Sequence, residues 1–181
     1  MHDTAAVAAA TAWLGMFSET LAKGDIAATL ELFAEDCYWR DIVAFTWNVK
    51  TMEGKPAIAA MLEATLAGTR PSGWQVESAS GAHSEPLTAW FSFATAVGQG
   101  RGIFTLEGGK CRTILTTLQA LDGHEEAIGF TRAMGVRHGA DRNRETGSEP
   151  RAREEASFGA GADPYCLVIG GGQGGIMLGA R

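Results

Sequence analysis

The stretch LFAEDCYWRD, residues 32–41, marks the point where the chain changes from helical to strand-like periodicity. Before it, apolar residues recur every three or four positions; within it, the period becomes two. Trp39 and Asp41 therefore fall on one face, and Tyr38 and Arg40 fall on the other. The aromatic content favours a strand. The stretch thus predicts a strand that carries an acidic and an aromatic side chain on the same face.

Three helices are predicted around this strand. Apolar spacing over residues 4–22 predicts the first, which Gly24 ends. Asp25 is a candidate cap for the second helix. The third follows the sequence EGKPA, because Pro56 suits a first helical turn. All three have an apolar stripe that is expected to pack on a sheet.

The pattern becomes β downstream of Pro71. Strands are predicted near residues 74–79, 87–97, 102–107 and 110–121. Gly108 and Gly109 form a two-residue hairpin signal between the last two strands. Both sides of the strand over residues 87–97 are apolar, so one side is expected to meet the helices and the other a partner subunit. This order predicts an α+β fold, with three N-terminal helices packed on a curved antiparallel sheet.

Composition excludes several classes of protein. The 181 residues are 45% hydrophobic and carry a formal net charge of −6, with 15 Lys and Arg against 21 Asp and Glu, so no nucleic-acid partner is expected. The cysteines form no CxxC pair, which predicts neither a metal site nor a disulfide framework; they are Cys37, Cys111 and Cys166. No apolar run approaches the roughly 18 residues of a membrane span. We expect a soluble, cytoplasmic protein without a membrane partner.

The character of the sequence shifts again after residue 134. Residues 135–163 are charged, rich in glycine and poor in apolar periodicity, which predicts a linker or a strap across the surface. The alternative is a solvated helix within residues 149–157. Domain boundaries are therefore expected at 1–134, 135–163 and 164–181.

The last segment, DPYCLVIGGGQGGIMLGAR, has the pattern of a dinucleotide-binding turn. Residues 165–169 form an apolar run typical of a buried parallel strand. The glycines that follow fit G-x-G-x-x-G and extend it by four: Gly170, Gly172, Gly175 and Gly179. The first allows a tight turn, the second lets the backbone approach a pyrophosphate, and the third allows close packing. A flexible glycine-rich linker is the alternative.

The order helix–helix–LFAEDCYWRD–helix–sheet resembles the NTF2-like superfamily over residues 4–130, including the SnoaL-like and ketosteroid-isomerase-like cone folds. With WRDIVAFTWNVKTMEGKPAI, GVRHGA and the glycine-rich tail, the chain is similar to the N-terminal part of bacterial flavin-dependent monooxygenase-like oxidoreductases. The resemblance implies an NTF2-like domain ahead of a FAD-binding Rossmann domain, interrupted shortly after that domain begins. It also implies FAD and NADPH as cofactors of the full-length protein, and a homodimer through the sheet.

The resemblance further implies an apolar pocket that holds an Asp or a His. Asp41 is the best candidate, as a general base enclosed by aromatic side chains. The candidate walls are Trp13, Trp39, Phe45, Trp47, Trp90 and Phe91. Alternatively, Asp41 ties down the following loop through Asn48 and the backbone of residues 44–50. We favour this second interpretation because no second catalytic group can be named, and no spacing of His or Cys predicts a metal site.

Two functions follow. In the first, the domain is an accessory module of a flavin-dependent monooxygenase, for dimerisation, as a lid or for binding a small molecule. The acidic residue expected about 20 positions after the glycine turn lies beyond Arg181, so this chain alone is expected to bind no FAD and to perform no redox catalysis. In the second, it is a stand-alone ketosteroid-isomerase-like or SnoaL-like enzyme that uses Asp41 on a small apolar ligand.

Overall fold

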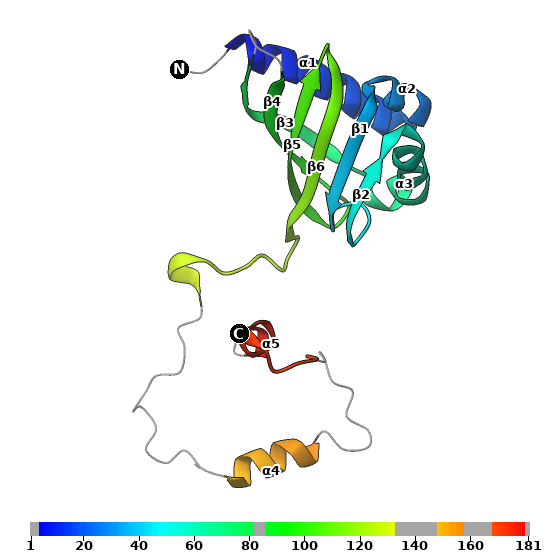
Figure 1. The fold of residues 1–181 in the computed structure, drawn as a ribbon. Coiled ribbons are helices and arrows are strands. Elements are labelled where there is room, and N and C mark those ends of the chain that lie inside the picture. Colours follow the sequence, from blue (N-terminus) through cyan, green and yellow to red (C-terminus); the bar gives the residue numbers. More distant parts are fainter. Residues whose placement is uncertain (1–3, 82–85, 133–147, 158–167, 180–181) are drawn as a thin grey trace. The chain divides into compact units, whose positions relative to one another are not determined.

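The computed structural model describes residues 4–81, 86–132, 148–157 and 168–179. The chain divides into two compact units, residues 1–132 and 133–181, and each is described by itself (Figure 1).

The first unit begins with the helices that the sequence predicts. They are α1 (Thr4–Lys23), α2 (Ile26–Glu31) and α3 (Gly54–Thr69). The carboxylate of Asp25 caps α2, since it accepts a hydrogen bond from the backbone N–H of Ala28 at 2.9 Å. By length and composition α1 is long and apolar enough to cross a membrane. The core helices of soluble proteins also meet this criterion. Its buried face contacts the sheet, which identifies it as a core helix.

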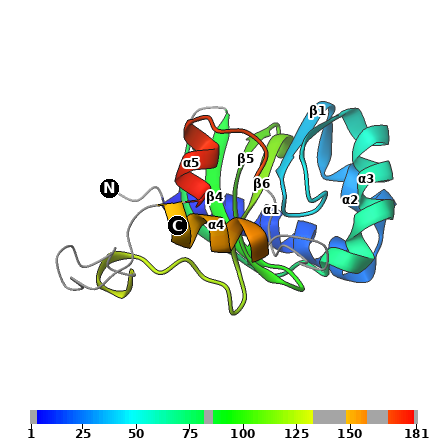
Figure 2. The same cartoon turned by 90° about the horizontal axis from the view of Figure 1, so that it is seen from below.

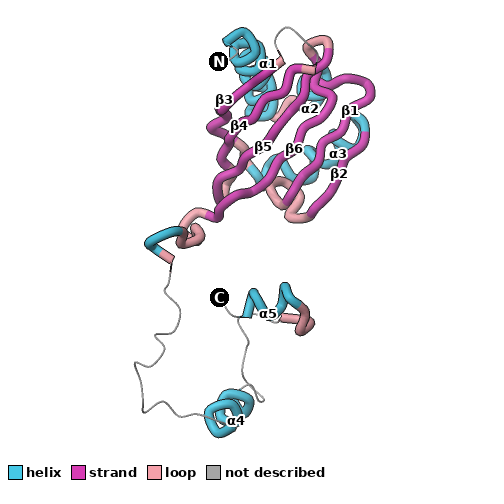
Figure 3. Tube along the Cα trace, turned by 60° about the vertical axis from the view of Figure 1, so that its left-hand side comes forward, coloured by secondary structure: helices cyan, strands magenta, loops and turns pink. Residues whose placement is uncertain are grey.

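The strands of this unit form one curved six-stranded sheet (Figure 3). In chain order they are β1 (Phe33–Ile42), β2 (Val49–Glu53), β3 (Ser72–Ser80), β4 (Leu87–Ala94), β5 (Gly98–Glu107) and β6 (Lys110–Leu121). Their order across the sheet is β2-β1-β6-β5-β4-β3. The helices cover one face: α1 crosses β3 and β4, whereas α2 and α3 contact β1 (Figure 2).

The expectation of a wholly antiparallel sheet is wrong, because β1 and β6 are parallel, with Trp39 opposite Ile114. The chain leaves β1 through the hairpin to β2, crosses by α3 to the far edge and returns through three antiparallel steps. The hairpin and these three steps make four reversals, and an even number brings β6 back beside β1 in the same direction. The sequence also missed β2, whose apolar residues Val49 and Met52 lie three positions apart and not two.

The space between sheet and helices is filled by aromatic rings. Neighbouring ring centroids lie 4.6 to 6.3 Å apart. The cluster consists of Trp13, Phe17, Phe33, Trp39, Phe45, Trp74, Phe91, Phe93 and Phe104. Such rings dominate the energetics of a small core because each buries a large apolar area.

Two glycines of β5 make room for this cluster. Gly100 lies opposite Phe93 and Gly102 lies opposite Phe91 in the β4–β5 pairing. A Cβ atom built at Gly100 would lie 2.4 Å from the Phe93 ring, and one at Gly102 would lie 2.3 Å from the Phe91 ring. The rings of β4 therefore occupy the space that side chains of β5 would take. The glycines at 100 and 102 in the stretch GQGRG, residues 98–102, are therefore required for the packing of the core.

Replacement of Gly102 by alanine is expected to destabilise the protein by about 1–3 kcal/mol, because the added methyl group has no room beside the Phe91 ring. The matched control is Gly15→Ala in the middle of α1, where a Cβ would meet nothing within 4 Å. This control is expected to stabilise by about 0.5–1 kcal/mol through helix propensity. Urea unfolding measures both; equal effects of the two substitutions would contradict the packing argument.

The described part of the second unit contains two helices. Residues Ser148–Ser157 form α4, where the alternative interpretation expected a solvated helix. Residues Gln173–Gly179 form α5 after the glycine turn. The strand predicted over residues 165–169 lies mostly outside the described residues, and Val168 and Ile169 are not in a strand.

Candidate functional site

The carboxylate of Asp41 is the polar centre of the first unit. It lies on the inner face of β1 and is fully buried. Its Oδ2 accepts hydrogen bonds from the backbone N–H groups of Phe45 at 3.0 Å and Thr46 at 2.8 Å, and from the Thr46 hydroxyl at 2.8 Å. Its Oδ1 accepts one from the Thr116 hydroxyl at 2.7 Å. Four donors thus hold this carboxylate, three of them at Oδ2 and one at Oδ1.

A chain of hydrogen bonds connects this carboxylate to the aromatic core. The indole Nε1 of Trp39 donates to the Thr116 hydroxyl oxygen at 2.9 Å, and that hydroxyl donates to Asp41. All three side chains are fully buried, and Thr116 lies opposite Asp41 in the parallel β1–β6 pairing. A buried charge is tolerated only when it is fully hydrogen-bonded, and this network meets that need.

The loop that Asp41 holds has a strained backbone. Val43 and Trp47 adopt positive φ angles of 56° and 53°, which residues other than glycine rarely adopt. Such residues cost about 1–3 kcal/mol each and persist only where their surroundings impose them. The N–H of Val43 donates to the carbonyl oxygen of Asn48 at 3.0 Å and closes the loop. Asp41 therefore holds the loop after β1, as the second interpretation of this residue expects. Its contacts are Phe45 and Thr46, and not the Asn48 side chain.

The expected pocket walls separate into two groups. Trp13, Trp39, Phe45 and Phe91 are all buried in the aromatic cluster, where they contact other rings.

The other two wall candidates do not face the interior. Trp47 is 63% exposed on the strained loop. Trp90 is 40% exposed and lies under the guanidinium of Arg101, 4.9 Å from its ring centroid. The alternation of β4 turns Trp90 outward, since its neighbours Ala89 and Phe91 face the core.

Sequence reasoning missed Trp74, which lies inside the cluster from β3. Its ring stacks on Phe93 at 4.7 Å with an interplanar angle of 13°. Its indole Nε1 is buried and has no hydrogen-bond partner within the described residues. The alternation of Trp74 and Val76 on the strand was the available signal for an inward-facing ring.

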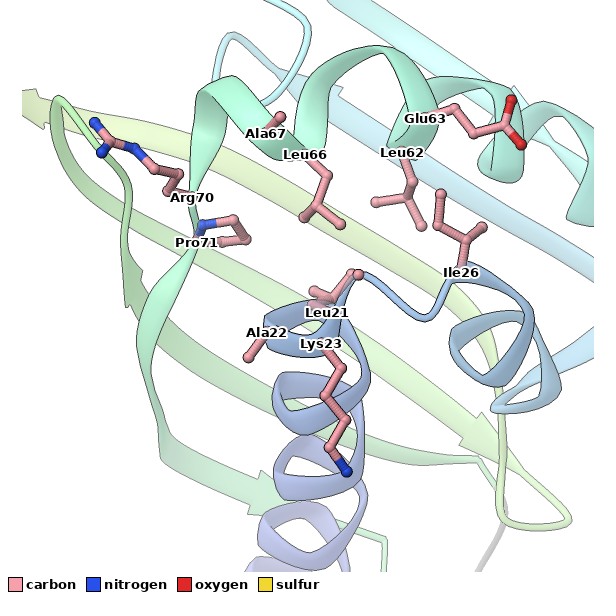
Figure 4. Close-up of a pocket in the computed structure, with 11 residues that line it drawn as sticks. Leu21, Ala22, Lys23, Ile26, Leu62, Glu63, Leu66, Ala67, Arg70 and Pro71 are labelled. Carbon is pink, nitrogen blue, oxygen red and sulfur yellow. The ribbon is translucent and has the colours of Figure 1, made fainter.

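Two of the grooves on the helical side of the first unit are lined by α3. One, of about 530 Å³, lies between the end of α1, the start of α2 and α3 (Figure 4). Its apolar floor is formed by Leu21, Leu62 and Leu66, and the charged ends of Lys23 and Arg70 extend away from that floor. The other groove, of about 480 Å³, lies between the Asp41-anchored loop, β2 and α3.

The described cysteines do not form a reactive or metal-binding site. Burial raises the pKa of the Cys111 thiol well above its ordinary value, and burial also raises the pKa of Cys37. Both are therefore neutral thiols at pH 7. Within the described ranges, no three His, Cys, Asp or Glu side chains lie close enough to hold a metal ion. Cys166 lies outside those ranges.

The glycine turn of the second unit has two positions that only glycine fits. Gly170 has a positive φ of 104°. A Cβ atom at Gly175 would lie 2.1 Å from the carbonyl oxygen of Gly170. The N–H of Ile176 donates to the carbonyl oxygen of Gly172 at 3.0 Å, at the start of α5. A side chain would therefore be strained at Gly170 and crowded at Gly175.

Comparison with known proteins identifies the fold of the first unit. No family model and no curated protein matches the sequence. A ketosteroid isomerase-like protein from Erwinia carotovora atroseptica superimposes with a TM-score of 0.53 at 9% identity, over 63% of this chain and 96% of that one. RV0760c from Mycobacterium tuberculosis gives a TM-score of 0.47 at 14% identity, over 60% of this chain and 92% of that one.

An NTF-2 like protein of unknown function from Burkholderia xenovorans gives a TM-score of 0.42 at 14% identity, over 60% of this chain and 80% of that one. At these identities the similarity is one of fold alone. The first unit has the NTF2-like α+β fold, as the resemblance implied. The flavin-dependent parent stays a prediction.

Removal of the Asp41 carboxylate, which holds the loop, is expected to lower the free energy of unfolding. Asp41→Ala leaves the N–H groups of Phe45 and Thr46 without an acceptor, so we expect a loss of about 2–4 kcal/mol in the free energy of unfolding. The control is Asp25→Ala, which removes an exposed helix cap and costs about 1 kcal/mol.

Urea denaturation compares these two variants. Hydrogen exchange of the Phe45 and Thr46 amides in Asp41→Asn gives a second readout, with faster exchange expected. A loss for Asp41→Ala no larger than that for Asp25→Ala, with unchanged exchange in Asp41→Asn, would show that Asp41 is not the anchor.

Proposed function

We propose that the first unit is an accessory module that dimerises through the outer face of its sheet and has no chemistry of its own. The observation that carries this proposal is an apolar row on that face. Trp90, Ile103 and Leu115 are consecutive cross-strand partners on β4, β5 and β6, with Arg40 of β1 next in line. A surface hollow of about 430 Å³ lies over this part of the sheet.

The inner face already has its partner, because the helices and the aromatic cluster cover it. No described residue of the first unit outside the sheet is seen to cover the outer face, and its Trp90 is 40% exposed. Tryptophan is enriched in the centres of interfaces, where threonine and charged residues form the rim. Thr105 and Thr113 flank the apolar row on β5 and β6. A second copy can cover this face with the same row, as an isologous two-fold contact requires.

The state of Asp41 argues against the alternative of a stand-alone enzyme. A general base needs a free lone pair within reach of a substrate proton. Asp41 is fully buried and held by four donors, and Phe45 and Trp39 pack beside it in the ring cluster, so a substrate proton cannot reach it. The predicted isomerase-like or cyclase-like role of Asp41 therefore has no geometric support.

If the sheet faces form the dimer, a charge at Trp90 should change the mass of the protein in solution. The native chain is expected to sediment as a dimer, and Trp90→Glu is expected to be monomeric, because a charge would be buried at the centre of the contact. Met16→Glu on α1 is the control, since Met16 is 49% exposed on another surface. Sedimentation equilibrium measures the masses. A monomeric native chain, or a monomeric Met16→Glu variant, would refute the sheet-face dimer.

We further propose, from the resemblance, that the module serves a FAD-dependent, NADPH-using monooxygenase. The geometry of Gly170 and Gly175 supports a dinucleotide turn at residues 168–179. In such a domain, backbone N–H groups near Gly172 would approach the FAD pyrophosphate, and Gly179 would continue the packing face of the helix. The redox chemistry would belong to FAD and to residues outside these 181.

A chimera tests the identity of this turn. Residues 165–179 are placed in a well-behaved FAD-binding domain, in exchange for its own first strand, turn and helix start. We expect the chimera to retain FAD and the Gly175→Val chimera to lose it, because Gly175 has no room for a side chain beside Gly170. FAD content is read from flavin absorbance. Failure of the unsubstituted chimera to bind FAD, with its fold intact, would refute the assignment.

A further inference from the structure

The groove between the Asp41-anchored loop, β2 and α3 has the dimensions of a small-molecule site. Its volume of about 480 Å³ lies within the usual range for such sites, about 300–1,000 Å³. Met52 and Met61 form a buried floor, at 2% and 6% exposure. Its lining residues are Thr46, Asn48, Lys50, Thr51, Met52, Ala57, Ala60, Met61, Ala64 and Thr65. This lining combines an apolar floor with polar groups at one end.

The polar end is cationic. Lys50 is the charged residue among the lining side chains, which include no Asp or Glu. This is notable in a chain whose net charge is −6. Lys23 and Lys55 are paired with glutamates, and Lys110 donates to the carbonyl oxygen of Glu31. Lys50 has no such partner in the described part of the chain, and its charge is available to an anion.

The ammonium of Lys50 is not used by the buried carboxylate. Lys50 lies opposite Asp41 in the β1–β2 pairing, on the inner side of the edge strand. The four hydrogen bonds to Asp41 nevertheless come from the loop and from Thr116. Beside Lys50, the side-chain oxygen of Asn48 accepts from the N–H of Val49 at 2.8 Å, which leaves its amide nitrogen as a donor.

The α3 side of the groove includes three alanines. Ala57, Ala60 and Ala64 lie on the α3 side, where methyl groups allow a planar body to come close to the helix. The loop that carries Thr46 is held rigidly by Asp41, so the site is formed before a ligand arrives.

We propose that this groove binds a small organic anion with a flat apolar body. The carboxylate or sulfonate pairs with Lys50 and accepts from the Asn48 amide, while the apolar body lies on Met52, Met61 and the alanines of α3. This site lies on the helical side of the sheet, and Thr51 is the lining residue that it shares with the hollow of the proposed dimer face.

The probe is 2-naphthoate, titrated into the full isotope-labelled chain and followed by amide chemical shifts. We expect saturable shifts confined to residues 43–52 and 57–65. The neutral analogue 2-naphthamide is expected to bind about two- to fivefold more weakly, the range for a partly exposed charge pair. Lys50→Gln is expected to weaken the binding of 2-naphthoate by the same factor and to leave the affinity for 2-naphthamide unchanged.

Two alanines of α3 provide a matched pair of variants. Ala60 and Ala67 are both exposed on the same helix, but Ala60 lines this groove and Ala67 lines the groove of Figure 4. Leucine is close to alanine in helix propensity, so both variants are expected to fold. Ala60→Leu is expected to weaken 2-naphthoate at least about tenfold by filling the site. Ala67→Leu is expected to leave it unchanged.

Several outcomes would overturn the proposal. One is the absence of saturable shifts at about 10 mM 2-naphthoate, where a weak specific site would be occupied. Others are shifts centred on the groove of Figure 4, equal weakening by Ala60→Leu and Ala67→Leu, or equal affinity for the acid and the amide.

Discussion

The buried carboxylate of Asp41 determines the shape of the helical side of the sheet. It joins β1 to β6 through Thr116 and joins both strands to the loop before β2. A carboxyl group removed from water in this way requires hydrogen-bond donors, and the chain supplies three of the four by bending the loop back over β1. The positive φ angles of Val43 and Trp47 follow from that bend. The position of the edge strand follows as well.

The core is organised by a second constraint, the size of its rings. Phe91 and Phe93 from β4 lie over β5, which has glycine at the facing positions. Aromatic side chains that cover glycine on a neighbouring strand compensate for the weak packing of glycine in a sheet. The result is a filled cone, in which the space between sheet and helices is taken by the protein's own rings. Binding of other molecules is therefore expected at its outer grooves and faces.

Much of this arrangement was accessible from the sequence. Helical spacing predicted the N-terminal helices, and alternation predicted that Trp39 and Asp41 share a face. The parallel β1–β6 contact was not accessible, since it depends on the count of strand reversals, and the short β2 has no alternating pattern. The outward position of Trp90 was readable from alternation, but aromatic content alone had suggested a wall of a pocket.

The pairing of β1 with β6 also bears on how the chain folds. Asp41 and Thr116 are separated by 75 positions in the sequence, whereas β3 to β6 are joined in succession by short connections. Contacts between distant segments carry the larger loop-closure entropy and form more slowly. The meander from β3 to β6 is thus the part able to form first. The N-terminal helices and β1 are then expected to close the core later, when Asp41 and Thr116 come together.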